Sequence, residues 1–425
     1  MEEKPSHFDI LVIGGGAAGF FAAINAARFS PPESVREKKI AILEKSTKVL
    51  AKVRISGGGR CNVTHACFDP RELVKFYPRG GKELRGAFSR FSVEQTIEWY
   101  KSRGVELKTE NDGRMFPISD NSETIVNCLL SEVEKYGVEI LLQKDLKGIE
   151  KSSDKFILSV NETEKYSCSK LIIATGGNAK SAGYDFLRKT GHTIIPPVPS
   201  LFTFNMPNNP ITELMGVSVE NAIVKIEGTA IETNGPLLIT HWGMSGPAIL
   251  KASAWGAREL ANRDYDFTAV VNWIPGKTEE TVFEELKTAK TIFNAQLFIN
   301  INPFHMVKRL WQFLVFKNKL DNELRWADLP NKQLRNMAQL LVSDKYPVKG
   351  KTTFKEEFVT CGGIALNEID FKTMQSRIMK GLFFAGEIVD IDGLTGGFNF
   401  QAAWTTGWLA ACGSTEINTK MAEIK

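Results

Sequence analysis

The hydrophobic pattern near the start of the chain predicts a buried strand followed by a helix. The run Ile10–Ile13 is apolar without interruption, which is typical of a short strand covered on both faces. Ala17–Ala27 is rich in alanine with helically spaced apolar positions, and Gly14, Gly16 and Gly19 mark the turn between them. A strand, then spaced glycines, then a helix is the context of a dinucleotide-binding turn. We therefore expect a dinucleotide site here.

Each glycine of this turn has its own expected role. Gly14 permits the tight turn, Gly16 lets a pyrophosphate approach the backbone, and Gly19 lets the helix lie against the strand. The amides at the helix N-terminus then face the phosphates. A second strand, Lys39–Leu43, ends at Glu44, whose carboxylate suits a ribose hydroxyl and disfavours a 2′-phosphate.

Later hydrophobic runs predict more strands and a domain boundary. Strands are expected at Val138–Gln143, Phe156–Val160 and Lys170–Gly177. The proline-rich run Pro196–Ser200 cannot continue a helix or a central strand, so we place the exit from the first domain near His192.

The rest of the chain changes character twice. Short β-type runs reach to about Trp273 and predict a small barrel or sandwich. From Lys277 to about Ser343 the apolar spacing is helical, which indicates an inserted helical subdomain. From Phe358 the pattern returns to strands and glycines. A cofactor-type segment at both ends of the chain implies a discontinuous cofactor domain.

This second glycine-rich segment indicates FAD as the cofactor. Leu382–Ala385 is typical of a buried strand before Gly386 and Glu387, and small residues precede a final helix that begins near Asn399. The small residues leave space for a planar ring, and a helix N-terminus stabilises negative charge on a reduced flavin. A nicotinamide enzyme needs only the first glycine segment, whereas FAD reaches from the N-terminal helix to a C-terminal one.

Composition narrows the class of protein further. The chain has 425 residues, of which 43% are hydrophobic and 24% are charged, with a net charge of +4, which is ordinary for a globular protein. Because no long block of like charge occurs, we expect no nucleic-acid partner. The polar start lacks the order of a secretory signal and the first apolar run is too short to span a bilayer, so we expect a cytoplasmic protein without a membrane partner. The scattered cysteines are expected to be reduced thiols, and the unpaired spacing of the histidines predicts no metal site.

Five longer segments resemble one bacterial family. They read EKSTKVLAKVRISGGGRCNVTH, GRMFPISDNS, THWGMSGPAIL, CGGIALNEIDFKTMQSR and GLFFAGEIVDIDGLTGGFNFQAAWTTG. Together they are similar to the bacterial FAD-dependent flavoproteins labelled NAD(P)/FAD-dependent oxidoreductase, aminoacetone oxidase family, whose relatives include bile-acid enone reductases. The resemblance runs nearly end to end, although Thr373–Arg377 reads TMQSR where such relatives usually have TMESK.

The resemblance implies an α/β fold with a discontinuous, glutathione-reductase-type (Rossmann-like) FAD domain, an inserted β-barrel and a helical subdomain. We expect residues 1–192 to form the first part of the FAD-binding domain, 193–275 the inserted β-barrel, 276–345 a helical cap, and 346–425 the return to the barrel edge and the second part of the FAD-binding domain.

The resemblance and the glycine segments together predict the residues that contact FAD. They are Gly14, Gly16, Ala17, Ala18, Gly19, Glu44, Lys45, Lys52, Ser56, Gly57, Gly58, Gly59, Arg60, Cys61, Asn62, Leu146, Ala174, Thr175, Gly176, Gly177, Gly386, Glu387, Gly397, Asn399 and Phe400. Because no His or Cys attachment motif stands out, we expect the FAD to be noncovalent.

Four side chains are candidates for chemistry. Arg60 and Lys52 are expected to bind pyrophosphate or to offset charge on a reduced flavin, with a plain surface role as the alternative. Cys61 has no resolving partner in sequence, so we interpret it as a packing thiol beside the cofactor. His241 is the best candidate for proton transfer, and a structural histidine is the competing interpretation.

These features favour an FAD-dependent oxidoreductase that reduces a small organic substrate, for example a conjugated enone, with NAD(P)H as the candidate electron donor. An amine or amino-ketone oxidase that uses O₂ and a flavin-binding sensor without turnover are the alternatives. We expect the substrate between the flavin ring, Cys361–Gly363 and Thr240–Gly243. The sequence leaves open the physiological substrate, the choice of NADH or NADPH, and the oligomeric state.

Overall fold

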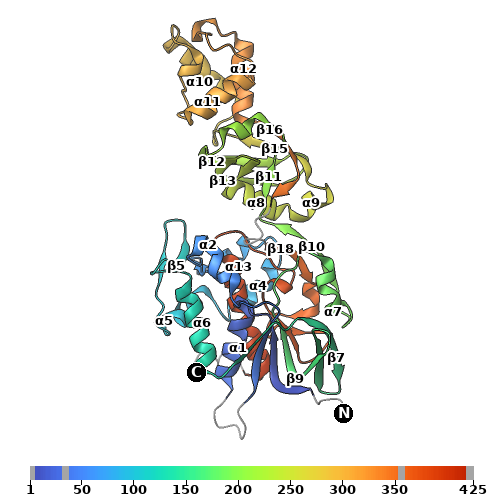
Figure 1. Cartoon of the computed structure of the whole chain (residues 1–425). Coiled ribbons are helices and arrows are strands. Elements are labelled where there is room, and N and C mark those ends of the chain that lie inside the picture. The colour runs from blue at the N-terminus through green and yellow to red at the C-terminus, as the bar shows by residue number, and fades with distance from the viewer. Residues whose placement is uncertain (1–4, 31–37, 353–358, 418–425) are drawn as a thin grey trace. The chain divides into compact units, whose positions relative to one another are not determined.

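The computed structural model describes residues 5–30, 38–352 and 359–417, and the chain divides into two compact units (Figure 1). Unit 1 combines Met1–Ser200 with Lys355–Lys425, and unit 2 is Leu201–Phe354. The two segments of unit 1 are therefore joined in space although unit 2 separates them in sequence.

Unit 1 ends later than the expected exit near His192. The proline-rich run belongs to β10 (Ile194–Ser200), which pairs antiparallel with β18 (Val359–Ile364), with a register shift between Ile195 and Val198. Among the residues that the structure describes, β10 pairs with β18 alone, so its prolines interrupt no further ladder there. The prolines therefore lie inside a strand of unit 1 and do not mark its boundary.

The main sheet of unit 1 is parallel at its centre, where β21, β9, β1, β2 and β6 lie side by side in that order. Its strands are β1 (Ser6–Ile13), β2 (Ile40–Glu44), β6 (Glu139–Leu142), β7 (Leu146–Ser152), β8 (Lys155–Val160), β9 (Glu164–Ile173), β19 (Ile369–Asp370), β20 (Gln375–Ser376) and β21 (Leu382–Phe384). A central parallel strand is covered on both faces, which explains the uninterrupted apolar runs of β1 and β2. The antiparallel hairpins β7–β8 and β8–β9 extend the sheet.

Helices from both ends of the chain pack together against this sheet. Those of unit 1 are α1 (Ala17–Phe29), α2 (Ala51–Gly59), α3 (Pro70–Leu73), α4 (Gly81–Phe88), α5 (Val93–Lys101), α6 (Glu123–Lys135), α7 (Asp185–Arg188) and α13 (Phe398–Thr415). A Cβ at Gly407 of α13 would lie 2.7 Å from the Ala18 carbonyl oxygen of α1, so this glycine allows the two helices to approach closely. A small sheet of β3 (Thr64–His65), β5 (Arg114–Pro117) and β4 (Leu107–Thr109) completes the unit.

Unit 2 contains an antiparallel sheet and three longer helices that share one core. The sheet order is β16-β15-β12-β13-β14-β11-β17, with β11 (Thr203–Asn205), β12 (Ser218–Ile226), β13 (Glu232–Thr240), β14 (Gly243–Ser245), β15 (Asp266–Asn272), β16 (Asp344–Lys349) and β17 (Lys351–Thr352). The helices are α8 (Pro247–Trp255), α9 (Ala257–Asn262), α10 (Glu279–Ile292), α11 (Lys308–Lys317) and α12 (Asn331–Val342). Val271 of the sheet and Leu286, Trp311 and Leu341 of the helices belong to the same buried cluster. The predicted helical segment is therefore part of the same compact unit as the sheet.

Candidate functional site

The first glycine turn has the geometry that the sequence predicts. Gly14 has a φ of +112°, and a Cβ there would lie 2.4 Å from the carbonyl oxygen of Ala174. A Cβ at Gly19 would lie 1.9 Å from the carbonyl oxygen of Gly14, so both positions require glycine. At Gly16, in contrast, a Cβ would meet no heavy atom of the described chain within 4 Å. The turn is therefore tight on the protein side and open at Gly16, where α1 begins.

Glu44 ties the end of β2 to this turn. Its carboxylate accepts hydrogen bonds from the backbone N–H of Gly15 at 2.7 Å and of Ser46 at 2.8 Å. The backbone N–H of Lys144 donates to the Glu44 carbonyl at 2.9 Å, and this brings the start of β7 at Leu146 toward the same edge of the sheet. The positions predicted to contact an ADP half thus converge at the carboxyl ends of β1 and β2, where ligands of parallel sheets bind.

The segment Ser56–Asn62 is the expected glycine loop. Helical geometry stops inside α2, because Ser56 is extended and Gly57 and Gly58 are left-handed, with φ of +59° and +69°. A Cβ at Gly58 or at Gly59 would meet no heavy atom of the described chain within 4 Å. The loop therefore exposes bare backbone to a ligand.

Cys61, within this loop, is a packing thiol. Its side chain is fully buried, and burial raises the pKa of its thiol to about 12, against a smaller opposing effect of a hydrogen bond with Ser56. Because the nucleophile of thiol chemistry is the thiolate, Cys61 is inert at neutral pH.

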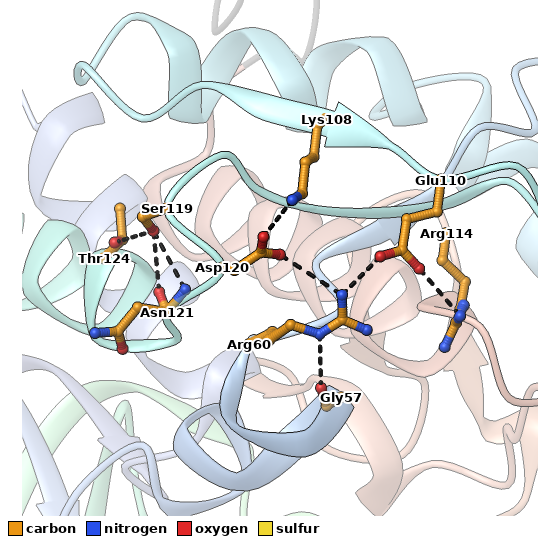
Figure 2. A network of polar contacts seen from close by, with 9 residues as sticks. All are labelled: Gly57, Arg60, Lys108, Glu110, Arg114, Ser119, Asp120, Asn121 and Thr124. Carbon is orange, nitrogen blue, oxygen red and sulfur yellow. Dashed lines mark hydrogen bonds and ion pairs between the residues drawn. The ribbon is translucent and has the colours of Figure 1, made fainter.

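Arg60 points toward the β3–β5–β4 sheet and is held by acidic side chains (Figure 2). Its guanidinium lies 2.6 Å from the Glu110 carboxylate and 3.6 Å from that of Asp120. It also stacks over the ring of Phe116, 4.0 Å from the ring centroid. Lys108 bonds Asp120 and Arg114 bonds Glu110, so the network neutralises both carboxylates. In this arrangement Arg60 supports the glycine loop from the protein side, and a direct contact with pyrophosphate stays a prediction.

Lys52 and Glu387 join the loop region to the C-terminal segment. Their side chains form an ion pair at 2.8 Å, with Glu387 largely shielded and Lys52 half exposed. The other carboxylate oxygen of Glu387, Oε1, is buried and has no hydrogen-bond partner among the residues that the structure describes. A buried acceptor without a partner is costly, so Glu387 Oε1 is suited to accept a hydrogen bond from a ligand hydroxyl or amide.

The segment Ala174–Gly177 lies between the first glycine turn and Glu387. The backbone N–H of Ala174 donates to the Ile13 carbonyl at 2.8 Å, which continues the β1–β9 pairing past the strand ends. A Cβ at Gly176 would lie 3.8 Å from Glu387 Oε2, and one at Gly177 would lie 2.3 Å from Thr360 Oγ1. Sequence segments far apart in the chain therefore meet at one edge of the sheet.

At the N-terminus of α13, the side chain of Asn399 binds the backbone of the preceding loop. Its side-chain amide bonds both the N–H and the carbonyl of Gly393, at 2.8 and 2.9 Å. Gly397 is the residue before the helix, with a φ of +94° and no side-chain cap on the first amides. Phe400 stacks on Trp404 with the ring centroids 5.6 Å apart. Asn399 therefore shapes the loop while the uncapped amides of the helix are left for a ligand.

The remaining predicted residues follow the strands of the same sheet or flank the glycine loop. Ala17 and Ala18 begin α1, and Lys45 and Thr175 are exposed just after β2 and β9. Asn62 is buried at the end of the glycine loop. Gly386 donates its N–H to Thr406 Oγ1 at 2.9 Å.

His65 is a residue of this region that the sequence analysis missed. Its Nδ1 lies 2.9 Å from the Gly396 carbonyl oxygen, and its ring stacks on Phe398 with the centroids 4.5 Å apart. Burial lowers the pKa of His65 below the usual range, so the neutral ring predominates at pH 7. Only its position three residues after the glycine loop hinted at this role.

His241 belongs to unit 2, whereas the residues described above belong to unit 1. It begins the β13–β14 turn, is exposed, and meets the Trp242 ring edge to face with the centroids 4.3 Å apart. Cys361–Gly363 of the expected substrate site belongs to β18 of unit 1. A role of His241 beside the flavin therefore stays a prediction.

The residues of unit 1 fit an FAD in two respects. The openings at Gly16, Gly58 and Gly59 give a ligand access to backbone amides, and Glu387 Oε1 supplies a buried acceptor in need of a donor. Within residues 5–30, 38–352 and 359–417, no group of His, Cys, Asp or Glu side chains could hold a metal ion. In the same ranges, no helix is long and apolar enough to cross a membrane.

Comparisons with known proteins give a family match over most of the chain. The model of the family described as HI0933-like protein Rossmann domain matches residues 8–413. The ribosomal RNA dihydrouridine synthase of Escherichia coli (strain K12) is 30% identical over 416 residues, which cover 95% of this chain and 97% of that protein. The 3-dehydro-bile acid delta(4,6)-reductase of Clostridium scindens is 27% identical over 421 residues, covering 95% of this chain and 98% of that protein.

A solved structure shows the same fold at low sequence identity. The 3-ketosteroid-delta4-(5alpha)-dehydrogenase from Rhodococcus jostii RHA1 superposes with a TM-score of 0.51 and 13% identity, covering 97% of this chain and 98% of that one.

Proposed function

Because the chain belongs to the HI0933-like Rossmann family, we propose that it binds FAD and reduces a carbon–carbon double bond conjugated with a carbonyl group. The predicted family, the Rossmann-like FAD fold and the assignment to FAD-dependent oxidoreductases are confirmed at the level of the family. The individual cofactor contacts, the substrate and the electron donor are parts of the proposal.

The site supports an extended FAD along the edge of the main sheet. Gly16 and the first amides of α1 would receive the pyrophosphate, and Glu44 would accept a hydrogen bond from the adenosine ribose. The open backbone of Gly58 and Gly59 and the acceptor Glu387 Oε1 would hold the middle of the cofactor. The first amides of α13 would face the pyrimidine edge of the flavin ring.

When bound, the flavin supplies the hydride chemistry. The chain's own residues supply position and charge: Lys52 pairs with Glu387 and orients its carboxylate, and the uncapped amides of α13 favour negative charge beside them. Asn399 and His65 hold the loop before α13 in place through Gly393 and Gly396. Proton delivery is assigned to His241 as a prediction.

The observation that carries the reaction class is the chemistry common to two full-length relatives. The name of the Clostridium scindens relative describes reduction of double bonds in a bile acid with an oxidised 3-position. Dihydrouridine, in the name of the Escherichia coli relative, is uridine whose ring double bond, conjugated with a carbonyl, is saturated. Both names describe reduction of a conjugated double bond, as the enone hypothesis from sequence expects.

The two relatives favour different sizes of substrate. A small enone agrees with the modest net charge of +4, since binding to nucleic acid relies on many phosphate contacts with basic side chains. The uracil base of ribosomal RNA is the second candidate, favoured by the relative that is 30% identical over nearly its whole length.

One set of measurements tests the proposal. The purified protein should be yellow, and acid should release FAD, whereas released FMN or a chromophore retained by the precipitate would contradict noncovalent FAD. Anaerobic NADH or NADPH should bleach the flavin, and a 3-oxo-Δ4 steroid or the ribosomal RNA of a strain lacking the gene should restore its colour. Mass spectrometry of the steroid or of the RNA nucleosides then identifies the reduced product. Peroxide formation with an amine substrate would instead support the oxidase, and no reduction by either nucleotide would support the sensor.

A further inference from the structure

A hollow of unit 1 lies at the other end of α1 from the glycine turn. Its volume is about 320 Å³, and it is formed where the last turn of α1, the α5 region and α13 meet. Its lining consists of Arg28, Phe91, Gln95, Glu98, Trp99, Ser102, Arg103 and Trp408. The size is within the range of small-ligand pockets. Nothing in the proposed reductase function uses this hollow.

The aromatic part of the hollow is fixed by packing. Phe91 and Trp408 stack with the ring centroids 5.2 Å apart, and both are almost fully buried. Trp99 is held by a hydrogen bond from its indole N–H to Asn25 at 3.2 Å. The wall is therefore formed before any ligand binds, so a ligand would lose little binding energy to ordering it.

The two arginines of the hollow differ in whether they form an ion pair. Arg28 forms no ion pair within 4.0 Å with any carboxylate among the described residues, whereas the neighbouring Arg103 pairs with Glu132 at 2.6 Å. The titratable groups around Arg28 are Arg103, Tyr136, Glu132 and Cys412, and burial followed by repulsion from Arg103 lowers the pKa of Arg28. Glu98 is exposed at the rim and lies within ion-pair distance of neither arginine. An anion placed beside Arg28 would therefore relieve an unfavourable arrangement.

Arg103 makes a cation–π contact with the aromatic wall of the hollow. Its guanidinium lies over the Trp99 ring, 3.8 Å from the centroid, while it donates to the Trp99 carbonyl at 2.8 Å. Trp408 offers a further donor, because its indole N–H makes no hydrogen bond with a residue that the structure describes. An aromatic wall with a guanidinium and an indole donor suits a planar ring that carries an acidic group.

We propose that this hollow binds a small planar organic anion, such as an aromatic carboxylate, with Arg28 as the charged anchor and with Trp99 and Trp408 as parts of its apolar wall. The site is separate from the substrate of the reductase, since it lies at the opposite end of α1 from Gly16.

Titration calorimetry of the flavin-loaded protein with 2-naphthoate tests this proposal. Wild type should bind one equivalent, and 2-naphthamide, which has the same rings without the charge, should bind at least tenfold more weakly. Arg28→Gln should weaken 2-naphthoate binding at least tenfold, and Arg28→Lys, which keeps the charge, should recover part of the loss. Arg85→Gln, at an exposed arginine of α4, is the matched control and should bind as wild type does.

The result that overturns the proposal is equal binding of 2-naphthoate by wild type and by folded Arg28→Gln, or no binding by wild type. Because Arg28 lies in the last turn of α1, where a cation also favours the helix, the melting temperature of each variant is measured alongside. If Arg28→Gln does not fold, Trp408→Phe replaces it, and unchanged binding by that variant counts against the site.

Discussion

The ammonium group of Lys52 donates a hydrogen bond to the carboxylate of Glu387 at 2.8 Å, across 335 positions of the chain. This contact joins α2, which contains Lys52, to the turn after β21, and the sequence predicts FAD contacts in both segments. It leaves the second oxygen of Glu387 buried without a partner in the described part of the chain. The ion pair therefore links two distant segments, and substitution of Glu387 can test where the cofactor lies.

Glu387→Gln should weaken FAD binding tenfold to a hundredfold. The substitution removes the charge that Lys52 holds, and a hydrogen bond to a charged group contributes about 1.5–3 kcal/mol. Flavin fluorescence during dilution measures the affinity. The control is Glu416→Gln, which breaks an ion pair of the same length, 2.8 Å, with Lys170 at an exposed position. Equal FAD affinity in the two variants would remove Glu387 from the cofactor site.

Gly16→Val should abolish FAD retention while the protein still folds. The backbone of Gly16 has a φ of −91°, which valine adopts, and the space next to its Cβ position is open, so the side chain would fill the room meant for the pyrophosphate. The visible absorbance of the flavin relative to the protein concentration gives the occupancy. Gly86→Val in α4 is the control, since a Cβ there meets only Arg90 at 3.5 Å. A folded Gly16→Val protein with full flavin content would refute this placement.

Cys61 should destabilise the protein as the pH rises through the alkaline range. Its thiol has a pKa of about 12 in the folded chain against 9.0 for an ordinary cysteine. The unfolded chain therefore loses this proton first, and between these two pH values the free energy of unfolding should fall by about 1.4 kcal/mol per pH unit on account of Cys61. Urea unfolding of wild type and Cys61→Ala measures the two slopes. Below pH 9 the slopes should agree, and agreement above pH 9 as well would show that the thiol is not shielded.

His241→Asn should lower turnover at least tenfold and leave the flavin spectrum and FAD occupancy unchanged. Removal of a general acid typically costs about 10²–10⁴ in rate. His305→Asn, at another exposed histidine of unit 2, is the control. Loss of FAD or unfolding in His241→Asn would make the residue structural, and unchanged turnover on the identified substrate would exclude proton transfer.

The sequence by itself determined the elements whose signal is local. Gly14 and Gly19 are recognisable because a strand and a helix flank them, and the structure shows backbone atoms where any Cβ would stand. The helical spacing after Lys277 likewise predicted α10, α11 and α12. Apolar spacing and glycine positions report on neighbours a few residues away, which is why a single sequence reveals them.

Only the tertiary structure decided which distant residues meet. It gave Arg60 the acidic partners Glu110 and Asp120, although its glycine loop had indicated a phosphate contact. It placed His65 against Gly396 and moved the domain exit from His192 to Ser200, because β10 finds its partner β18 far along the chain. Such pairings depend on how the chain closes on itself in space, and the local pattern of hydrophobic and polar residues carries no record of them.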